Sequence, residues 1–534
     1  MARKTSPQKR KTGKTPSIIV PRYLADMSEG SPSSEWTFPL LERAEKEIGD
    51  IARDTFHIDA YPNQIEIVSS EQMMDAYSST GMPTFYHHWS FGKQFVQVEK
   101  AYRRGEMGLA YELVINSNPC ISYLMEENTM AMQLLVIAHA CFGHNSFFKN
   151  NYLFKKWTEA DAIIDYLVFA RDFIGKCEEE YGYEEVAEFL DACHALQGYG
   201  VDRYKHPPKL SADEERKRQK DRADYLQTQV NDLWDKTIPR RDNAEAVKER
   251  FLAEPQENIL YFLEKNSPIL KPWQREIVRI TRKISQYFFP QRQTKVMNEG
   301  WATFWHYTLM NEAYDRRLIP DGFMIEFLKS HSGVVFQPDY DSPYYSGINP
   351  YVLGFNMFRD IRRICEHPTD EDRKWFPEIA GSPWLETVHY AMRNFKDESF
   401  IRQYLSPKVI RDMKLWGVLD HPSKNPEHYE VCAIHDKEGY REIRELLADE
   451  YDIGAIQPNI EVTDVNVRGD RALTLFHTAY NNRPLDQRNM EQVLRHIFIK
   501  LWGHPVRLES QKERKGVGIL CQYPPAANQT RMTY

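Results

Sequence analysis

The sequence VIAHACFGHNSFFKNN, residues 136–151, carries the strongest signal in the chain for both fold and function. An apolar run precedes it, so we expect a buried helix from Leu134 to Ala138. His139 and His144 follow, together with several asparagines. A helix that only had to pack would not carry imidazoles at these positions. The stretch therefore predicts a polar functional site inside a helical core.

A second stretch, MNEGWATFWHY at residues 297–307, carries Glu299 and His306 among aromatic residues. These two side chains are seven residues apart and lie two turns apart on one face of a helix. That spacing suits one metal ligand plus one residue that orients a ligand about as well as it suits two ligands. His139 and His144 are five apart and would diverge on a straight helix, but a helix that ends at Gly143 would let His144 fold back. We expect the two stretches to meet.

The chemistry of these residues points to a metal. Imidazole and carboxylate ligands together suit zinc, iron or manganese, so the predicted divalent metal site consists of His139, His144, Glu299 and His306. Asn145 or Asn298 would orient an imidazole. Because neutral imidazoles are needed, binding should weaken below the usual histidine pKa of about 6.5. The alternative is a buried hydrogen-bond network without a metal.

A short motif adds a partial resemblance to zinc peptidases. Residues 298–302, NEGWA, resemble the NEGFA-type helix that supplies the third metal ligand in gluzincin aminopeptidases. Those enzymes carry HExxH about twenty residues upstream, where this chain has REIVR at residues 275–279. Arginine does not ligate zinc, so the ordinary peptidase mechanism is excluded. Glu276 and Glu299 are the candidate catalytic carboxylates.

Composition excludes several classes of protein. A net charge of -8 argues against a general nucleic-acid binder, because phosphate binding needs a basic surface. No window of 18 apolar residues predicts a membrane span, and the N-terminus has no apolar segment of a secretory signal. The seven scattered cysteines include no C-x-x-C and indicate reduced thiols in the cytoplasm.

The predicted fold class is mainly α, with a large helical body followed by a small α+β module. Strand and helix patterns after Tyr429 follow the order βαββαβ of a ferredoxin-like unit. The highly charged segment 211–235 is expected to be an exposed helical arm. The expected organisation is a disordered basic Ser/Pro tail at 1–33, the body at 35–420, a linker at 421–428, the module at 429–510 and a tail at 511–534.

Six longer segments are similar to the SpoVR family, named for stage V sporulation protein R. They are HHWSFGK (87–93), YELVINSNPCISYL (111–124), VIAHACFGHNSFFKNN (136–151), FLDACHALQGYGVDRY (189–204), YFFPQRQTKVMNEGWATFWHY (287–307) and INPYVLGFNMFRDI (348–361). The resemblance extends from about residue 35 to 510.

This resemblance implies a cytoplasmic protein that takes part in spore cortex formation or in a stationary-phase or stress response. It implies as partners a PrkA-type serine kinase and a von Willebrand-like protein, and neither nucleic acid nor a membrane. It names no reaction, so two functions stay open. One is a metal-dependent hydrolase with a non-standard zincin-like site, and the other is a non-enzymatic regulatory or scaffold protein that acts with the kinase. Either could be oligomeric, with the C-terminal module as the contact unit.

Overall fold

A computed structural model gives the structure of the chain. It describes residues 35–79, 86–103, 112–203, 255–339, 342, 344–420, 429–479, 485–512 and 516–525. The expected N-terminal tail, the charged arm at 211–235 and the linker at 421–428 lie outside the described residues.

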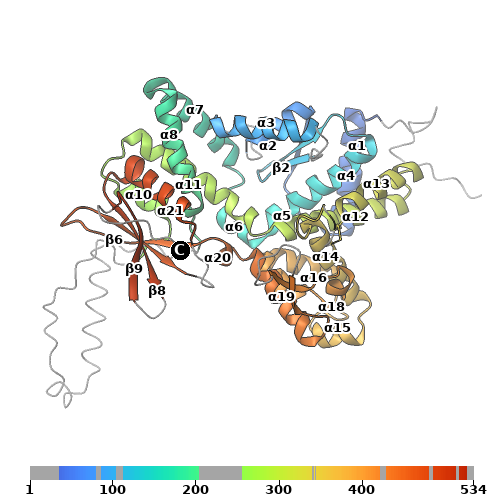
Figure 1. Ribbon diagram of the computed structural model, residues 1–534. Coiled ribbons are helices and arrows are strands. Elements are labelled where there is room, and N and C mark those ends of the chain that lie inside the picture. The colour runs from blue at the N-terminus through green and yellow to red at the C-terminus, as the bar shows by residue number, and fades with distance from the viewer. Residues whose placement is uncertain are drawn as a thin grey trace, which may run out of the picture.

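Helices build most of the described chain (Figure 1). None of those in the described ranges is long and apolar enough to span a membrane. The helices up to residue 412 are α1 (Phe38–Asp50), η1 (Ile51–Thr55), α2 (Ser70–Ser78), α3 (Trp89–Arg103), α4 (Met130–Val136), η2 (Ile137–His144), α5 (Asn145–Asn150), α6 (Tyr152–Trp157), α7 (Ile163–Tyr181), α8 (Tyr183–His194), η3 (Gln197–Tyr199), α10 (Ile259–Asn266), α11 (Pro272–Arg292), α12 (Lys295–Asp315), α13 (Asp321–Val334), α14 (Pro350–Glu366), α15 (Asp370–Trp375), α16 (Trp384–Asn394), α17 (Asp397–Tyr404) and α18 (Pro407–Asp412).

Helix α12 is the centre of the first hydrophobic core. Its aromatic residues Trp301, Phe304 and Trp305 are buried on several sides of the helix, so it must be enclosed by neighbours. On one side a Cβ placed on Gly300 would lie 2.3 Å from the Cα of Gly354 in α14. Only glycines allow two helix backbones to approach this closely, so α12 and α14 are locked together at this point.

A small sheet lies beside this core. Its strands are β1 (Asn63–Val68), β2 (Glu112–Ile115) and β3 (Cys120–Met125), in the order β1-β3-β2. Strand β1 is parallel to β3, and β2 is antiparallel to β3 with Glu112 opposite Leu124. Strand β2 is therefore an edge strand, and it lies next to η2.

A second hydrophobic core joins helices α7, α8, α10 and α11 to a C-terminal sheet. Its strands are β6 (Asn459–Val465), β7 (Leu473–Thr478), β8 (Val506–Lys512) and β9 (Gly516–Tyr523), in the order β6-β7-β8-β9, with β7 parallel to β8 and the other pairs antiparallel. Gln256, just before α10, bridges Val462 in β6. The remaining elements are β4 (Gly417–Asp420), β5 (Tyr429–Ala433), α19 (Lys437–Tyr451), α20 (Ile453–Ile456), α21 (Gln487–His496) and η4 (Ile497–Trp502).

The predicted class, mainly α with a small α+β module at the C-terminal end, is confirmed. The elements from β5 to β8 also follow the expected order along the chain, but β5 lies outside the module's sheet. It pairs with β4, its neighbour in sequence, as adjacent strands commonly do. Helix α19 packs on α17, where Arg402 contacts Glu445 and Asp449. The first strand and helix therefore extend the body. The fourth strand of the sheet is β9, which lies in the segment expected to be a tail.

Candidate metal centre

The histidines His139 and His144 converge because their helix is not an α-helix. Segment η2 is a π-helical stretch in which backbone hydrogen bonds join residues five apart. Residues i and i+5 lie about 140° apart around an α-helix, but a π-helical turn places them nearly one above the other. The two ring centroids are 4.6 Å apart. The sequence suggested that the helix ends at Gly143. In the structure the helix instead continues from η2 directly into α5.

Helix α12 delivers Glu299 from its first turns, and a buried carboxylate fixes the start of that helix. The Asp397 side chain accepts hydrogen bonds from the backbone N–H groups of Val296 and Met297, at 2.9 and 2.8 Å. These donors have no partner within the helix, so the contact satisfies them. Burial raises the pKa of Asp397 to about 7, against the lowering effect of these bonds. The position of Glu299 is thus set by a contact outside its own helix.

Carboxylate and imidazole groups from three elements meet at one point. Nε2 of His139 lies 3.2 Å from Glu112 Oε1 and 4.0 Å from Glu299 Oε2. Nε2 of His144 lies 3.5 Å from Glu299 Oε2. Atoms that share one metal ion at bonds of about 2.1 Å are roughly 3 to 3.5 Å apart. The observed separations are therefore near those of a metal's ligands. Glu112, His139 and His144 form a cluster that can hold a metal ion.

Glu299 Oε2 gives a further indication. This atom is buried and makes no hydrogen bond with any described residue. A buried carboxylate oxygen without a donor is costly, so such atoms usually have a partner. Both imidazole Nε2 atoms face it at more than 3.4 Å, and a cation between the three atoms would satisfy it.

Asn298 orients His144. The Nδ1 atom of His144 lies 3.0 Å from Asn298 Oδ1. An amide oxygen only accepts, so Nδ1 carries the proton and Nε2 keeps its lone pair for a metal. Asn145, the other residue proposed for this role, instead hydrogen-bonds with Tyr61 and Asn63 at the start of β1. It holds the helix against the sheet and does not orient an imidazole.

His139 is the first of three histidines in a row. Its Nδ1 lies 2.8 Å from Nδ1 of His306, and Nε2 of His306 lies 2.8 Å from Nδ1 of His331 in α13. The row is satisfied if Nδ1–H of His139 donates to His306 and Nε2–H of His306 donates to His331, and equally if both bonds run in the opposite direction. Burial lowers the pKa of His139 and of His306 well below 6.5, and it lowers that of His331 to about 4. All three rings are therefore neutral at pH 7.

These contacts separate the roles of Glu299 and His306, which sequence spacing left open. Glu299 faces the Nε2 atoms of both helix histidines, whereas His306 contacts His139 through the opposite ring nitrogen. His306 thus lies behind His139, in the place of a residue that orients a ligand. Glu276 lies on α11 and pairs with Arg279. It does not line the cavity that contains His139, His144 and Glu299.

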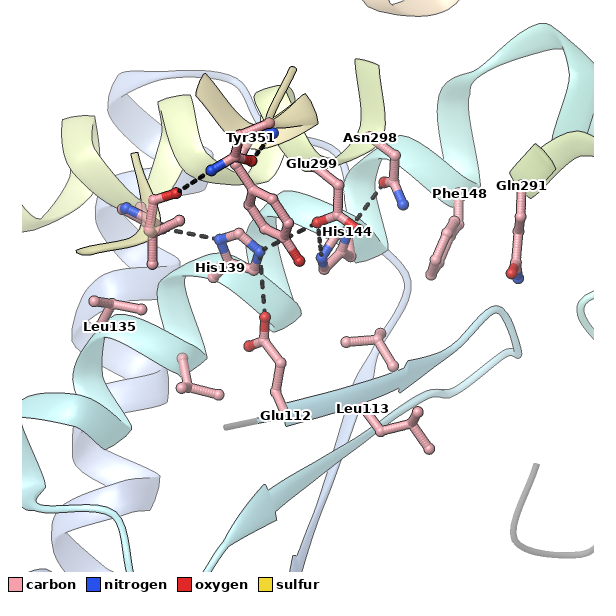
Figure 2. Close-up of a pocket in the computed structure, with 15 residues that line it drawn as sticks. Glu112, Leu113, Leu135, His139, His144, Phe148, Gln291, Asn298, Glu299 and Tyr351 are labelled. Carbon is pink, nitrogen blue, oxygen red and sulfur yellow. Dashed lines mark hydrogen bonds and ion pairs between the residues drawn. The ribbon is translucent and has the colours of Figure 1, made fainter. Parts of the chain in front are cut away.

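The site opens into a cavity of about 500 Å³ (Figure 2). Glu112 extends from β2 toward His139, and Glu299 approaches from the opposite side. Tyr351 of α14 stacks on His139, with ring centroids 6.3 Å apart. The lining residues are Glu112, Leu113, Val114, Leu135, Val136, His139, His144, Phe148, Gln291, Asn298, Glu299, His306, Val334, Asn349 and Tyr351.

Sequence reasoning missed Glu112 and His331. Burial raises the pKa of Glu112 well above its usual value, with a smaller contribution from the nearby Glu299. The one signal was a carboxylate at the start of the apolar strand ELVI, which pattern alone assigns to a solvent-exposed strand end. His331 had no signal, since its helix is separated from the site by 25 residues of chain.

Family models and a relative match this chain over nearly its whole length. The family model described as SpoVR like protein matches residues 35–456, and the model described as SpoVR-like C-terminal domain matches residues 458–513. The uncharacterized protein YcgB of Escherichia coli strain K12 is 58% identical over 502 residues, which cover 94% of this chain and 97% of that protein. No solved structure matches the chain. The two family models meet between α20 and β6, where the structure passes from the first core to the C-terminal sheet.

Proposed function

The chain belongs to the SpoVR family, and we propose that it is a metal-dependent hydrolase. The metal ion would be held by Nε2 of His139, Nε2 of His144 and Oε2 of Glu299. Glu112 would lie beside the remaining coordination position.

One observation carries the proposal, namely the convergence of two imidazole Nε2 atoms and a carboxylate oxygen that lacks a donor. Two histidines and a glutamate are the protein ligands of several catalytic zinc sites, which keep one position open. No cysteine belongs to the cluster. The donor set therefore suits zinc, and it also suits iron or manganese.

The surrounding residues support hydrolysis in particular. A divalent ion at this position would supply a Lewis acid and lower the pKa of a bound water. Glu112 lies within 3.2 Å of His139 Nε2 and has a raised pKa, which suits a group that takes and returns a proton. Asn298 and His306 hold the two imidazoles in position from behind.

A cytoplasmic location completes the proposal. All seven cysteines are free thiols, and six of them are buried. Unpaired thiols in this number are typical of a reducing compartment. Cell fractionation with an antibody against the native protein would test this location, and recovery outside the cytoplasm would contradict it.

The test of the reaction class uses the full chain. Protein stripped of metal by a chelator should hydrolyse no amide or ester, and zinc should restore the activity. Glu299→Gln should abolish both activity and metal retention, whereas Glu276→Gln on α11 should leave both unchanged. Restoration by iron(II) alone, with consumption of oxygen, would instead indicate the oxygenase chemistry that the same donor set supports. Zinc-loaded protein that cleaves nothing would favour a scaffold.

A further inference from the structure

We propose that the substrate is an extended peptide, which adds as a strand to the outer edge of β2 beside the metal centre. This inference rests on the proposed function and names its substrate class. The reaction would be peptide-bond hydrolysis. Water supplies a hydroxyl group to the acyl carbon as the C–N bond breaks, and its proton passes to the leaving amine, so no further reactant is needed.

The lining of the cavity shows where a ligand would lie. Three consecutive residues of β2, namely Glu112, Leu113 and Val114, all line it. Side chains of successive strand residues point to opposite faces of a sheet. A cavity on one face would touch every second residue, so contact with three in a row places the cavity along the strand's edge.

Among the described residues, that edge has no strand partner. In the sheet order β1-β3-β2, strand β2 pairs on one side with β3. Within the described chain, no strand pairs with its other side at Leu113–Ile115. Backbone N–H and C=O groups on such an edge bind an added strand in many peptide-binding proteins. An added peptide would run past Glu112, and so past the metal centre.

The opposite wall suits a peptide backbone. The side-chain amide of Gln291 makes no hydrogen bond with any described residue, and Asn298 uses only its oxygen, on His144. Figure 2 shows both amides on the side of Phe148, away from His139. They offer donors and acceptors for peptide groups. Leu135, Phe148 and Val334 offer apolar surface for a side chain.

Charge favours a neutral ligand. The described lining residues include two carboxylates, Glu112 and Glu299, and no lysine or arginine. A phosphorylated substrate usually meets arginine, lysine or a helix N-terminus. A peptide with uncharged side chains needs none of these.

The test measures binding of three probes to the zinc-loaded full chain by calorimetry. The probes are acetohydroxamate, N-acetyl-Ala-Leu-hydroxamate, and the same dipeptide methylated on its backbone nitrogens. We expect the dipeptide to bind at least tenfold more tightly than acetohydroxamate, and methylation to remove most of that gain. Equal affinities for the first two, or no effect of methylation, would overturn the peptide inference alone. No binding of acetohydroxamate would overturn the metal centre and the inference with it.

A variant pair localises the peptide. Gln291→Leu keeps the size of the side chain and should weaken the dipeptide several-fold while leaving acetohydroxamate unaffected. Gln403→Leu, at an exposed position of α17, should change neither. An equal loss for both probes in Gln291→Leu would show that this residue supports the fold and does not contact the peptide.

Discussion

At the scale of single residues, the contact between His144 and Asn298 tests the site most simply. Asn298→Leu removes the oxygen that holds Nδ1–H and should lower zinc affinity about 10- to 100-fold. Asn298→Asp keeps an acceptor and should retain the affinity. Titration against a coloured chelator measures both, with circular dichroism to confirm folding. Equal losses in the two variants would mean that this contact orients nothing.

The proton on Glu112 gives a prediction about pH. Because burial raises its pKa, Glu112 binds a proton in the metal-free protein at a pH where a free carboxyl group has lost it. A nearby cation favours the ionised form, so metal binding should release this proton, and affinity should rise with pH up to the raised pKa. Calorimetry in buffers of different ionisation enthalpy measures the release. Glu112→Gln should lower the number of protons released on metal binding by one. An unchanged number would contradict this role of Glu112.

Burial changes the pH at which the histidines are expected to lose metal. The usual histidine pKa predicted that metal binding weakens below about pH 6.5. The pKa of His139 is lowered well below this value, so His139 stays neutral into more acidic solution. Competition between protons and metal at this ring should begin correspondingly lower.

His389 provides a test of stability away from the cavity lining. Its ring packs against both Trp301 and Trp305, and its Nε2 donates to the Phe56 carbonyl at 3.1 Å. Burial lowers its pKa to about 4. As pH falls from about 6.5 to about 4, the unfolded chain takes up a proton that the folded chain refuses, so stability falls on acidification, by roughly 3 kcal/mol.

His389→Gln keeps a donor for Phe56 and should flatten that part of the pH profile in urea titrations. The variant and the natural protein should converge in stability as the pH is lowered. Parallel profiles would contradict the assignment of this pH dependence to His389.

At the scale of elements, the π-helical turn of η2 is the feature that forms the site. Residues five apart diverge on an α-helix, so the spacing of His139 and His144 predicted a break in the helix, placed at Gly143. The structure instead has a wider π-helical turn, and the helix continues beyond it. Hydrophobic periodicity hardly distinguishes the two, because every residue of η2 is buried. Gly143 serves a different purpose from the one expected, since it lets η2 touch α12.

Gly143→Ala tests that contact. A Cβ here would lie 2.6 Å from the Cα of Ala302 and would force η2 and α12 apart. We expect a loss of roughly 1–3 kcal/mol in stability and weaker zinc binding, because Glu299 lies on the displaced helix. Gly175→Ala in α7 is the control. Nothing lies within 4 Å of its Cβ position, so it should stabilise by about 0.5–1 kcal/mol. Stabilisation by Gly143→Ala in chemical denaturation would contradict the close approach.

At the scale of the whole molecule, the C-terminal sheet shares the second hydrophobic core with helices of the body. Val462, Leu475 and Leu508 pack with helices α7, α8, α10 and α11 of the body. A fragment from Tyr429 onward would lose this core and the partner of β5. Circular dichroism should show that this fragment is unfolded, whereas the full chain should unfold in one cooperative transition. A folded, monomeric fragment would contradict this expectation and support the division predicted from sequence at residues 421–428.

The sequence predicted the helical body because periodic apolar residues mark helices directly. It also selected His139, His144, Glu299 and His306, since polar residues within apolar helices are conspicuous, and the structure places these four in contact. The sequence did not predict Glu112 and His331 as site residues, because only tertiary packing brings a strand end and a distant helix to the site. It did not predict the pairing of β5 with β4 for the same reason, since local alternation predicts a strand but not the sheet that it joins.

X-ray absorption spectroscopy of the zinc-loaded full chain is the sharpest test of the proposed metal centre. We expect one zinc per chain, nitrogen and oxygen ligands at about 2.0–2.1 Å, scattering from two imidazoles and no sulfur. Glu299→Gln should lose the ion under the same conditions. Protein that retains no zinc at equimolar concentration, or a spectrum with zinc–sulfur distances of about 2.3 Å, would contradict it.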